Sequence, residues 1–299
     1  MKVAFFTEMG FNGKIPRTHK NMRTEFAWMV ALNATHYNLK SIPSENYDLG
    51  IVVNSKNNPE WVNVEGLKSK CEKVAIMQEG PFWYFQDYPL AKQIHYFNNL
   101  TSADIIYAHN EVDVQYFKGL TNHKDVRVLR SLMVEDPINE ITHPKSRSGI
   151  MVGGNMKSWY GGFDSFMLAS SVTDEIYQPK MGRREEGEDE LGLTQLPYME
   201  WDKWISELSK RKIGIHMMRT HAAGTFALNC SYLGIPCIGY DGLDTQRILH
   251  PSLTVKDGDL NTARKLISRL DNDSDFYTLC RNETFEMYNE HYHESKFKI

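Results

Sequence analysis

Short apolar runs recur along this chain, and the segments between them are long enough to form helices. Each run is four to six residues long, as in KVAFFT at residues 2–7 and KIGIHM at residues 212–217. Strands that crossover helices cover on both faces have this composition. We therefore predict an α/β fold with parallel sheets. The predicted strands lie at residues 2–7, 49–54, 73–77, 104–108, 126–129, 149–152, 175–178, 212–217, 236–240 and 253–256.

The runs form two groups, one on either side of residues 137–147, which we interpret as a linker. A chain of 299 residues is about the size of two compact domains. We predict an N-terminal domain at residues 1–140 and a C-terminal domain at residues 148–274. The segment 275–299 begins with a helical pattern, and we expect it to pack back toward the N-terminal domain. Other helices are predicted at residues 23–34, 88–100, 111–119, 201–210, 225–233 and 261–270.

The composition, with 41% hydrophobic and 24% charged residues, is that of a soluble globular protein. No window reaches the roughly 18 apolar residues that a membrane-spanning helix needs. We therefore expect no membrane span and a cytoplasmic protein, in the host cytoplasm if its source is viral. The four cysteines are far apart and include no C-x-x-C pair. This spacing predicts buried, reduced thiols and neither a zinc site nor a disulfide framework.

Charge is unevenly distributed along the sequence, although the net charge is only -4. Segment 12–23 holds four basic residues and no acidic one, whereas segment 185–190 reads EEGEDE. A negative net charge gives no support by itself to a nucleic-acid partner. Either run is consistent with a solvated surface, and the basic run is also consistent with phosphate binding. The basic residues are Lys14, Arg17, Lys20 and Arg23.

Residues that follow predicted strands are the first candidates for a functional site. In open parallel sheets, ligands bind beyond the carboxyl ends of the strands, where helix amino termini present free N–H groups. Glu8 and Glu79 follow strands of the N-terminal half. Because a carboxylate in a cleft can have its pKa tuned for proton transfer, both are candidate general bases. His36 and His216 are instead expected to be core or surface histidines.

Two segments of the C-terminal half have the composition of a phosphate site. Gly153 and Gly154 directly follow a predicted strand, and Lys157 comes shortly after them. Gly224 and Thr225 begin a predicted helix, and Asn229 lies one turn further on. Glycine lets a backbone approach a ligand closely, and lysine can neutralise a phosphate. The first segment is also consistent with an ordinary turn and the second with a plain packing helix.

Residues 78–90, QEGPFWYFQDYPL, are unusually rich in aromatic residues and include Trp83. Aromatic rings at this density either stack on a base or sugar or pack between domains. The sequence leaves both interpretations open.

The segment 213–241 resembles the donor-binding segment of GT-B glycosyltransferases. The resemblance rests on Gly234-x-Pro236, and it places Gly224 at the glycine that faces the donor phosphates. It places Asn229 at the glutamate that holds the donor ribose, and His221 at the glutamate that precedes it. Both glutamates of the family pattern are replaced here. The resemblance implies two Rossmann-like domains whose parallel sheets face a central cleft.

The chain also resembles the phage glucosyltransferases that modify hydroxymethylcytosine in DNA. In that family a strand, a glycine pair and a phosphate-binding arginine open the C-terminal half, and Gly153, Gly154 and Lys157 match this pattern with lysine for arginine. Leu196, before a proline, falls where a similar turn binds uracil through its backbone. Glu79 falls where that family has its catalytic aspartate.

The resemblance implies a hexosyl or pentosyl transferase that moves a sugar from a nucleotide diphosphate sugar, with UDP favoured, to an acceptor hydroxyl. The acceptor we favour is a hydroxymethylated pyrimidine in phage DNA. No metal is expected to be required, because no Asp-x-Asp pair lies in a suitable loop, and Mg²⁺ or Mn²⁺ is expected at most to stimulate. A transferase for a cell-surface glycan or lipid, an epimerase and a non-catalytic nucleotide-sugar-binding module remain alternatives. The oligomeric state is not predicted.

Each part of this reaction has candidate residues. The candidate catalytic residues are Glu79, Glu8 and His221. The candidate donor-binding residues are Gly154, Lys157, Arg183, Leu196, Gly224, Thr225 and Asn229. The candidate acceptor-binding residues are Lys14, Arg17, Arg23 and Trp83.

Overall fold

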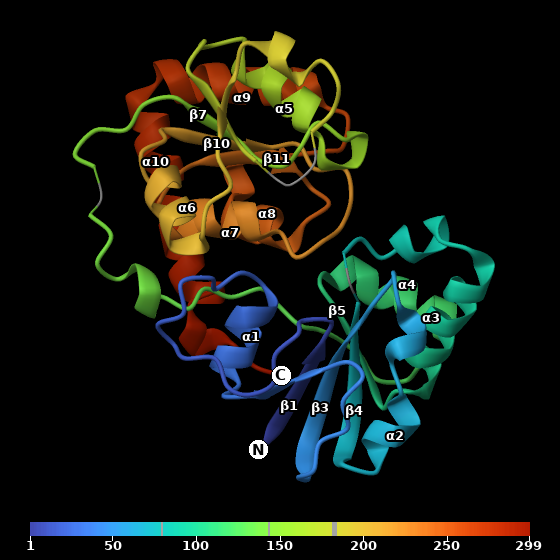
Figure 1. Ribbon diagram of the computed structural model, residues 1–299. Helices are drawn as coiled ribbons and strands as arrows, with labels where there is room; N and C mark the ends of the chain where they lie inside the picture. Colours follow the sequence, from blue (N-terminus) through green and yellow to red (C-terminus); the bar gives the residue numbers. More distant parts are fainter. Residues whose placement is uncertain (79, 143, 181–183) are drawn as a thin grey trace.

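The computed structural model describes residues 1–78, 80–142, 144–180 and 184–299. Within them the chain forms two six-stranded parallel sheets, one in each half of the molecule (Figure 1). The N-terminal sheet has the order β2-β1-β3-β4-β5-β6 and the C-terminal sheet the order β12-β11-β10-β7-β8-β9. The N-terminal strands are β1 (Val3–Thr7), β2 (Thr35–Asn38), β3 (Tyr47–Asn54), β4 (Cys71–Gln78), β5 (Ile105–Ala108) and β6 (Val126–Val128). The C-terminal strands are β7 (Ile150–Val152), β8 (Ile176–Pro179), β9 (Thr194–Leu196), β10 (Ile213–His216), β11 (Cys237–Tyr240) and β12 (Thr254–Val255).

Helices connect the strands and cover the sheets, so the α/β prediction with parallel sheets is confirmed. One buried apolar cluster fills the N-terminal domain and another the C-terminal domain. A third cluster spans both domains and includes Trp28, Leu132, Trp201 and Tyr288. The helices are α1 (Glu25–Ala31), α2 (Val64–Lys68), α3 (Leu90–Ser102), α4 (Glu111–Thr121), α5 (Gly162–Ala169), α6 (Trp201–Leu208), α7 (Thr225–Tyr232), α8 (Asp244–Leu249), α9 (Leu260–Asn272) and α10 (Ser274–His291).

Each predicted apolar run coincides with a strand, whereas the edge strands β2 and β9 were missed. Their sequences, THYN and TQL, are short and polar, because an edge strand need not be buried on both faces. The predicted helices are also present, but α2, α5 and α8 were missed. These three helices have five to eight residues, too few for a clear helical period in the sequence.

The linker and the C-terminal segment join the two domains. Helix α10 packs on α7, α8 and α9 of the C-terminal domain. Beyond that contact, the Tyr288 hydroxyl donates a hydrogen bond to Glu135, just before the linker, at 2.6 Å. Arg17 of the N-terminal domain forms ion pairs with Asp136 at 2.7 Å and Glu294 at 2.6 Å. The end of the chain therefore lies beside the N-terminal domain (Figure 1).

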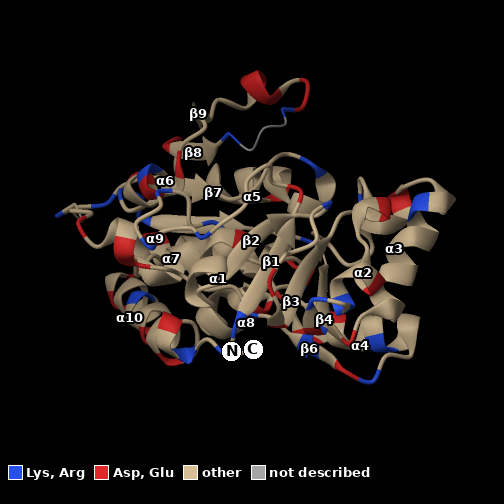
Figure 2. Cartoon of the chain, turned by 60° about the horizontal axis from the view of Figure 1, so that its bottom comes forward, with Lys and Arg blue, Asp and Glu red and all other residues tan. Residues whose placement is uncertain are grey.

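Charged residues occur along most elements of the chain, and acidic residues are concentrated on the loop between β8 and β9 (Figure 2). Most of the acidic run 185–190 in this loop is exposed, but Glu188 is buried and accepts a hydrogen bond from Gln195 at 2.8 Å. All four cysteines are among the described residues, and they are buried and free, as predicted. None of the described helices is long and apolar enough to cross a membrane.

Candidate functional site

A cavity of about 420 Å³ lies between the two domains, at the carboxyl ends of strands from both sheets. We call it the interdomain cavity. Its lining is mostly aromatic and apolar, with a few polar groups, which is typical of a small-molecule site. From the N-terminal domain it is lined by Met22–Thr24, Gly80–Pro81 and Leu132–Met133. From the C-terminal domain it is lined by Gly154, Trp159, Tyr160, Pro179, Lys180, Pro197–Met199, Trp201, Trp204, His216, Met218, Ala222–Phe226, Leu228 and Asn229.

The amino terminus of α7 opens into this cavity. Gly224 precedes the helix with φ of 66°, and no side chain caps the first turn. A Cβ on Gly224 would overlap the Thr245 hydroxyl, so this position accepts only glycine. Uncapped N–H groups and the helix dipole favour an anion here. The start of α7 is therefore suited to an anion, and the placement of Gly224 and Thr225 at a phosphate site stays a prediction.

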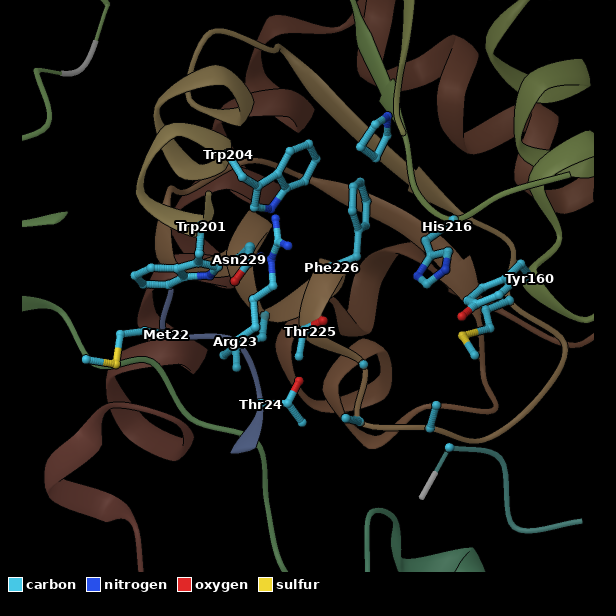
Figure 3. A pocket seen from close by; sticks show the side chains of 18 of the residues that line it. Met22, Arg23, Thr24, Tyr160, Trp201, Trp204, His216, Thr225, Phe226 and Asn229 are labelled. Carbon is cyan, nitrogen blue, oxygen red and sulfur yellow. The ribbon is translucent and has the colours of Figure 1, made fainter. Parts of the chain in front are cut away.

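Asn229 lies one helical turn after Thr225 and faces the same cavity (Figure 3). Asn229 is 5% exposed, and no hydrogen bond joins its amide to another described residue. Its amide atoms are not among the fully buried unpartnered ones, so they reach the cavity. The Asn229 amide is therefore free to bind a ligand that fills the cavity.

His216, at the carboxyl end of β10, is buried, as a core histidine would be, and it also lines the cavity (Figure 3). His216 is 6% exposed, and both ring nitrogens lack partners in the described residues. Burial lowers the pKa of His216 to about 4. The rule that ligands meet the carboxyl ends of strands applies to His216 as it does to Glu8 and would have identified it.

The glycine pair after β7 makes room for these rings. A Cβ on Gly153 would lie 2.9 Å from Phe226 and 3.0 Å from His216. A Cβ on Gly154, where φ is 80°, would lie 3.3 Å from Nε2 of His216. The sequence suggested that these glycines let the backbone approach a ligand closely. The structure adds a second reason for glycine here, because a side chain would crowd Phe226 and His216. Trp201 and Trp204 at the opposite end of the cavity were also missed, because their spacing on α6 is that of a buried helical face.

Three of the predicted donor-binding residues are not found at the cavity in the described structure. Lys157 does not line the cavity, and its Nζ lies 3.2 Å from a carboxylate oxygen of Glu185. The Leu196 carbonyl accepts a hydrogen bond from the backbone N–H of Lys180 at 3.1 Å, so the sheet already uses this group. The next residue, Pro197, lines the cavity in its place. Arg183 lies outside the described residues.

Two of the three predicted catalytic residues, Glu8 and His221, do not line the cavity. Glu79 lies outside the described residues. Glu8 does not line the cavity and accepts hydrogen bonds from Ser55 at 2.5 Å and Asn58 at 2.7 Å. His221 does not line the cavity either, because its Nδ1 lies 2.7 Å from the fully buried carboxylate of Asp113 on α4. His221 thus joins the two domains, and its assignment to the sugar stays a prediction.

The basic segment does not form one acceptor surface, contrary to our expectation. Lys14 donates a hydrogen bond to Asn33, close to the amino ends of the strands and away from the cavity. Two carboxylates hold Arg17, as described above, and they raise the pKa of its guanidinium. These positions offer no common surface to a phosphate backbone.

Arg23 alone of the predicted basic acceptor residues lines the cavity. Its guanidinium crosses to the C-terminal domain and donates hydrogen bonds to the Tyr198 hydroxyl at 3.1 Å and the Met199 carbonyl at 2.8 Å. Thr24, which follows it, has φ of 39°, a left-handed conformation that is rare for threonine and is often found at functional sites.

Trp83 packs between the domains. Its indole N–H donates a hydrogen bond to Thr220 at 2.6 Å, and its ring meets that of Trp159 edge to face at 6.3 Å. Of the two interpretations left open by the sequence, these contacts are those of interdomain packing.

A reciprocal pair of caps also joins the domains. Asn110 precedes α4, and its amide oxygen accepts a hydrogen bond from the backbone N–H of Asp244 at 2.9 Å. The Asp244 carboxylate, at the start of α8, accepts one from the backbone N–H of Glu111 at 2.9 Å. Each side chain thus caps the helix of the other domain, and both are buried. A further bond runs from Asn110 to the Ala222 carbonyl, beside the start of α7.

No family model and no curated protein matches this sequence. Solved structures do match, and the sucrose-phosphate synthase of Thermosynechococcus elongatus is similar over 99% of this chain and 96% of that one, with a TM-score of 0.69 and 10% identity. HepE of Anabaena, in complex with UDP and glucose, is similar over 99% of this chain and 97% of that one, with a TM-score of 0.70 and 10% identity. A trehalose-6-phosphate synthase of Burkholderia multivorans is similar over 83% and 68%, with a TM-score of 0.61 and 11% identity. With its two parallel sheets around an interdomain cavity, the chain therefore has the GT-B fold of the glycosyltransferases.

Proposed function

We propose that this protein transfers a glycosyl group from a nucleotide diphosphate sugar, with a UDP-sugar favoured, to an acceptor hydroxyl. The observation that carries the proposal is the uncapped start of α7, which opens into the interdomain cavity one turn before the unpartnered Asn229 amide. The N–H groups would bind the diphosphate and the amide would bind the ribose. The structures of HepE with UDP and glucose and with UDP-glucose support the choice of a UDP-sugar.

The same groups would assist the reaction. Charge accumulates on the diphosphate as the glycosyl bond breaks, and the fixed N–H groups at Gly224 and Thr225 would stabilise it. If the reaction inverts, a base takes the acceptor proton, and we assign this role to Glu79 on its sequence position after β4. Lys157 would have to leave Glu185 to reach the diphosphate. We propose no required metal, with Mg²⁺ or Mn²⁺ as a stimulant at most.

We define the acceptor only as a hydroxyl compound. The hydroxymethylated pyrimidine predicted from the sequence depended on a basic surface formed by segment 12–23. Because Lys14 lies near the opposite edge of the sheet and Arg17 is paired with two carboxylates, this support is lost. The relation to phage DNA glucosyltransferases stays a prediction.

Binding of UDP to the wild-type protein and to Asn229→Ala, measured by calorimetry, tests the donor site. We expect Asn229→Ala to weaken UDP binding by about 1 kcal/mol, or about fivefold in Kd, through loss of one hydrogen bond. Its melting temperature should not fall, because the amide has no protein partner to lose. Asn272→Ala, on the exposed face of α9, is the matched control and should bind UDP normally.

Mass spectrometry of reactions with UDP-sugars then tests for transfer to glycans, lipids and hydroxymethylated duplexes, with and without Mg²⁺. A mass gain of one sugar on an acceptor, or release of free sugar and UDP, would support an enzyme. UDP binding without either product would identify a non-catalytic binding module. A wild-type protein that binds neither UDP nor any UDP-sugar would refute the proposal.

A further inference from the structure

His216 differs from His36 and His250, two other buried histidines of this chain, because neither of its ring nitrogens has a partner among the described residues. His250 is 1% exposed, and its ring lies within hydrogen-bond distance of the Ala227 carbonyl at 3.0 Å and the Thr284 hydroxyl at 2.9 Å. His36 likewise contacts Thr7 at 2.9 Å and the Phe11 carbonyl at 2.8 Å. At His216 both ring nitrogens are buried without a partner among the described residues. An imidazole held in this state is expected to meet polar groups that the protein itself does not supply.

The ring is neutral at pH 7, because burial lowers its pKa to about 4. A neutral imidazole has one N–H donor and one acceptor nitrogen. Phosphate oxygens at this pH mainly accept hydrogen bonds, so a diphosphate would satisfy only the donor. A hydroxyl group both donates and accepts, and it can pair with either nitrogen. The chemistry of the ring therefore favours hydroxyl groups over phosphate.

The position of His216 in the cavity agrees with this chemistry. In Figure 3, Asn229, Thr225 and His216 follow one another across the cavity, with Phe226 beside His216. The rings of His216 and Phe226 meet edge to face at 5.3 Å, which fixes the imidazole. With the ribose at Asn229 and the diphosphate at Thr225, the next group of the donor lies on the His216 side. That group is the sugar.

We propose that His216 binds a hydroxyl group of the sugar that is transferred, and so helps to select that sugar. This inference rests on the proposed function, because it needs a nucleotide diphosphate sugar in the cavity. The subsite is formed by His216 with the glycine backbone at Gly153 and Gly154, where the missing Cβ atoms leave room for the ring.

The test compares the wild-type protein with His216→Phe. Phenylalanine removes both nitrogens and keeps an aromatic ring, so Kd for UDP should stay within about twofold of the wild-type value. For the UDP-sugar that the wild type binds, a set of monodeoxy analogues is then titrated into both proteins. We expect one analogue to bind the wild type about tenfold more weakly than the parent sugar. His216→Phe should lose this discrimination and bind parent and analogue equally.

Thermal melting without ligand separates a binding role from a structural one. Because His216 has no protein partner to lose, His216→Phe should melt at or above the wild-type temperature, as often happens when a site residue is removed. His250→Phe is the matched control and should melt lower, since His250 is fully hydrogen-bonded.

Three results would overturn the inference. The first is a His216→Phe variant that still discriminates against the same analogue. The second is a wild-type protein that discriminates against no analogue, and the third is a fall in melting temperature like that of His250→Phe. Absence of UDP and UDP-sugar binding by the wild type would instead refute the proposed function itself.

Discussion

Gly161 positions one wall of the cavity, since it follows Tyr160 and precedes α5. It has φ of 64°, and a Cβ there would overlap the carbonyl oxygen of Met217. Gly258 also has a positive φ, 83°, but has open space around its Cα. We predict that Gly258→Ala costs only the left-handed penalty of about 1–2 kcal/mol. Gly161→Ala should cost about 3 kcal/mol or more, because it adds a steric clash to this penalty.

Urea unfolding of the two alanine variants measures this difference in the free energy of unfolding. Equal losses would show that the backbone around Gly161 shifts freely to admit a Cβ. The Tyr160 wall would then be less rigid than the contacts indicate.

At the scale of elements, α4 and α8 depend on each other through the caps at Asn110 and Asp244. We predict that Asn110→Ala and Asp244→Ala each lower the free energy of unfolding by about 1 kcal/mol, the usual value of a cap. The double variant should lose less than the sum of the single losses, because losing either cap already loosens the contact between the domains.

A double-mutant cycle by urea unfolding measures this coupling, and Asp259→Ala supplies the control. Asp259 caps α9 within the C-terminal domain by accepting from the backbone N–H of Thr262 at 3.0 Å. The free energy of unfolding lost in Asp259→Ala should add to the free energy lost in Asn110→Ala. If the losses of Asn110→Ala and Asp244→Ala also add fully in the double variant, the two caps do not depend on each other, and reciprocal capping is contradicted.

For the whole molecule, buried histidines predict sensitivity to mild acid. Burial lowers the pKa of His109, His216 and His250 from the ordinary histidine value of 6.5 to about 4. Between these values the unfolded chain binds more protons than the folded one, so the free energy of unfolding falls as pH falls. The contribution of these histidines to the free energy of unfolding is fully present above pH 6.5. Below pH 6.5, each histidine lowers the free energy of unfolding by up to about 1.4 kcal/mol per pH unit.

Urea unfolding between pH 7 and pH 5 measures this slope. His216→Phe should make it shallower by removing one of the three groups, whereas His95→Gln, on the exposed face of α3, should leave it unchanged. A free energy of unfolding that is constant over this range would show that the three rings are accessible to protons in the folded state.

The sequence by itself determined the α/β fold with parallel sheets, because a strand buried on both faces must be an apolar run and such runs are visible without a structure. It also located the start of α7 and Asn229, since helix starts and strand ends have local signatures in the sequence. Edge strands β2 and β9 have no such signature, because they are short and polar.

Only the tertiary structure decided which residues share the cavity. Whether a histidine is hydrogen-bonded depends on groups that are distant in sequence, so His216, without partners, and His221, paired with Asp113, could not be distinguished. The same holds for Arg17 and Arg23, of which the first is held by two carboxylates and the second reaches into the cavity. Local sequence specifies backbone conformation and burial, whereas the partners of a charged or polar side chain are set by the packing of one domain against the other.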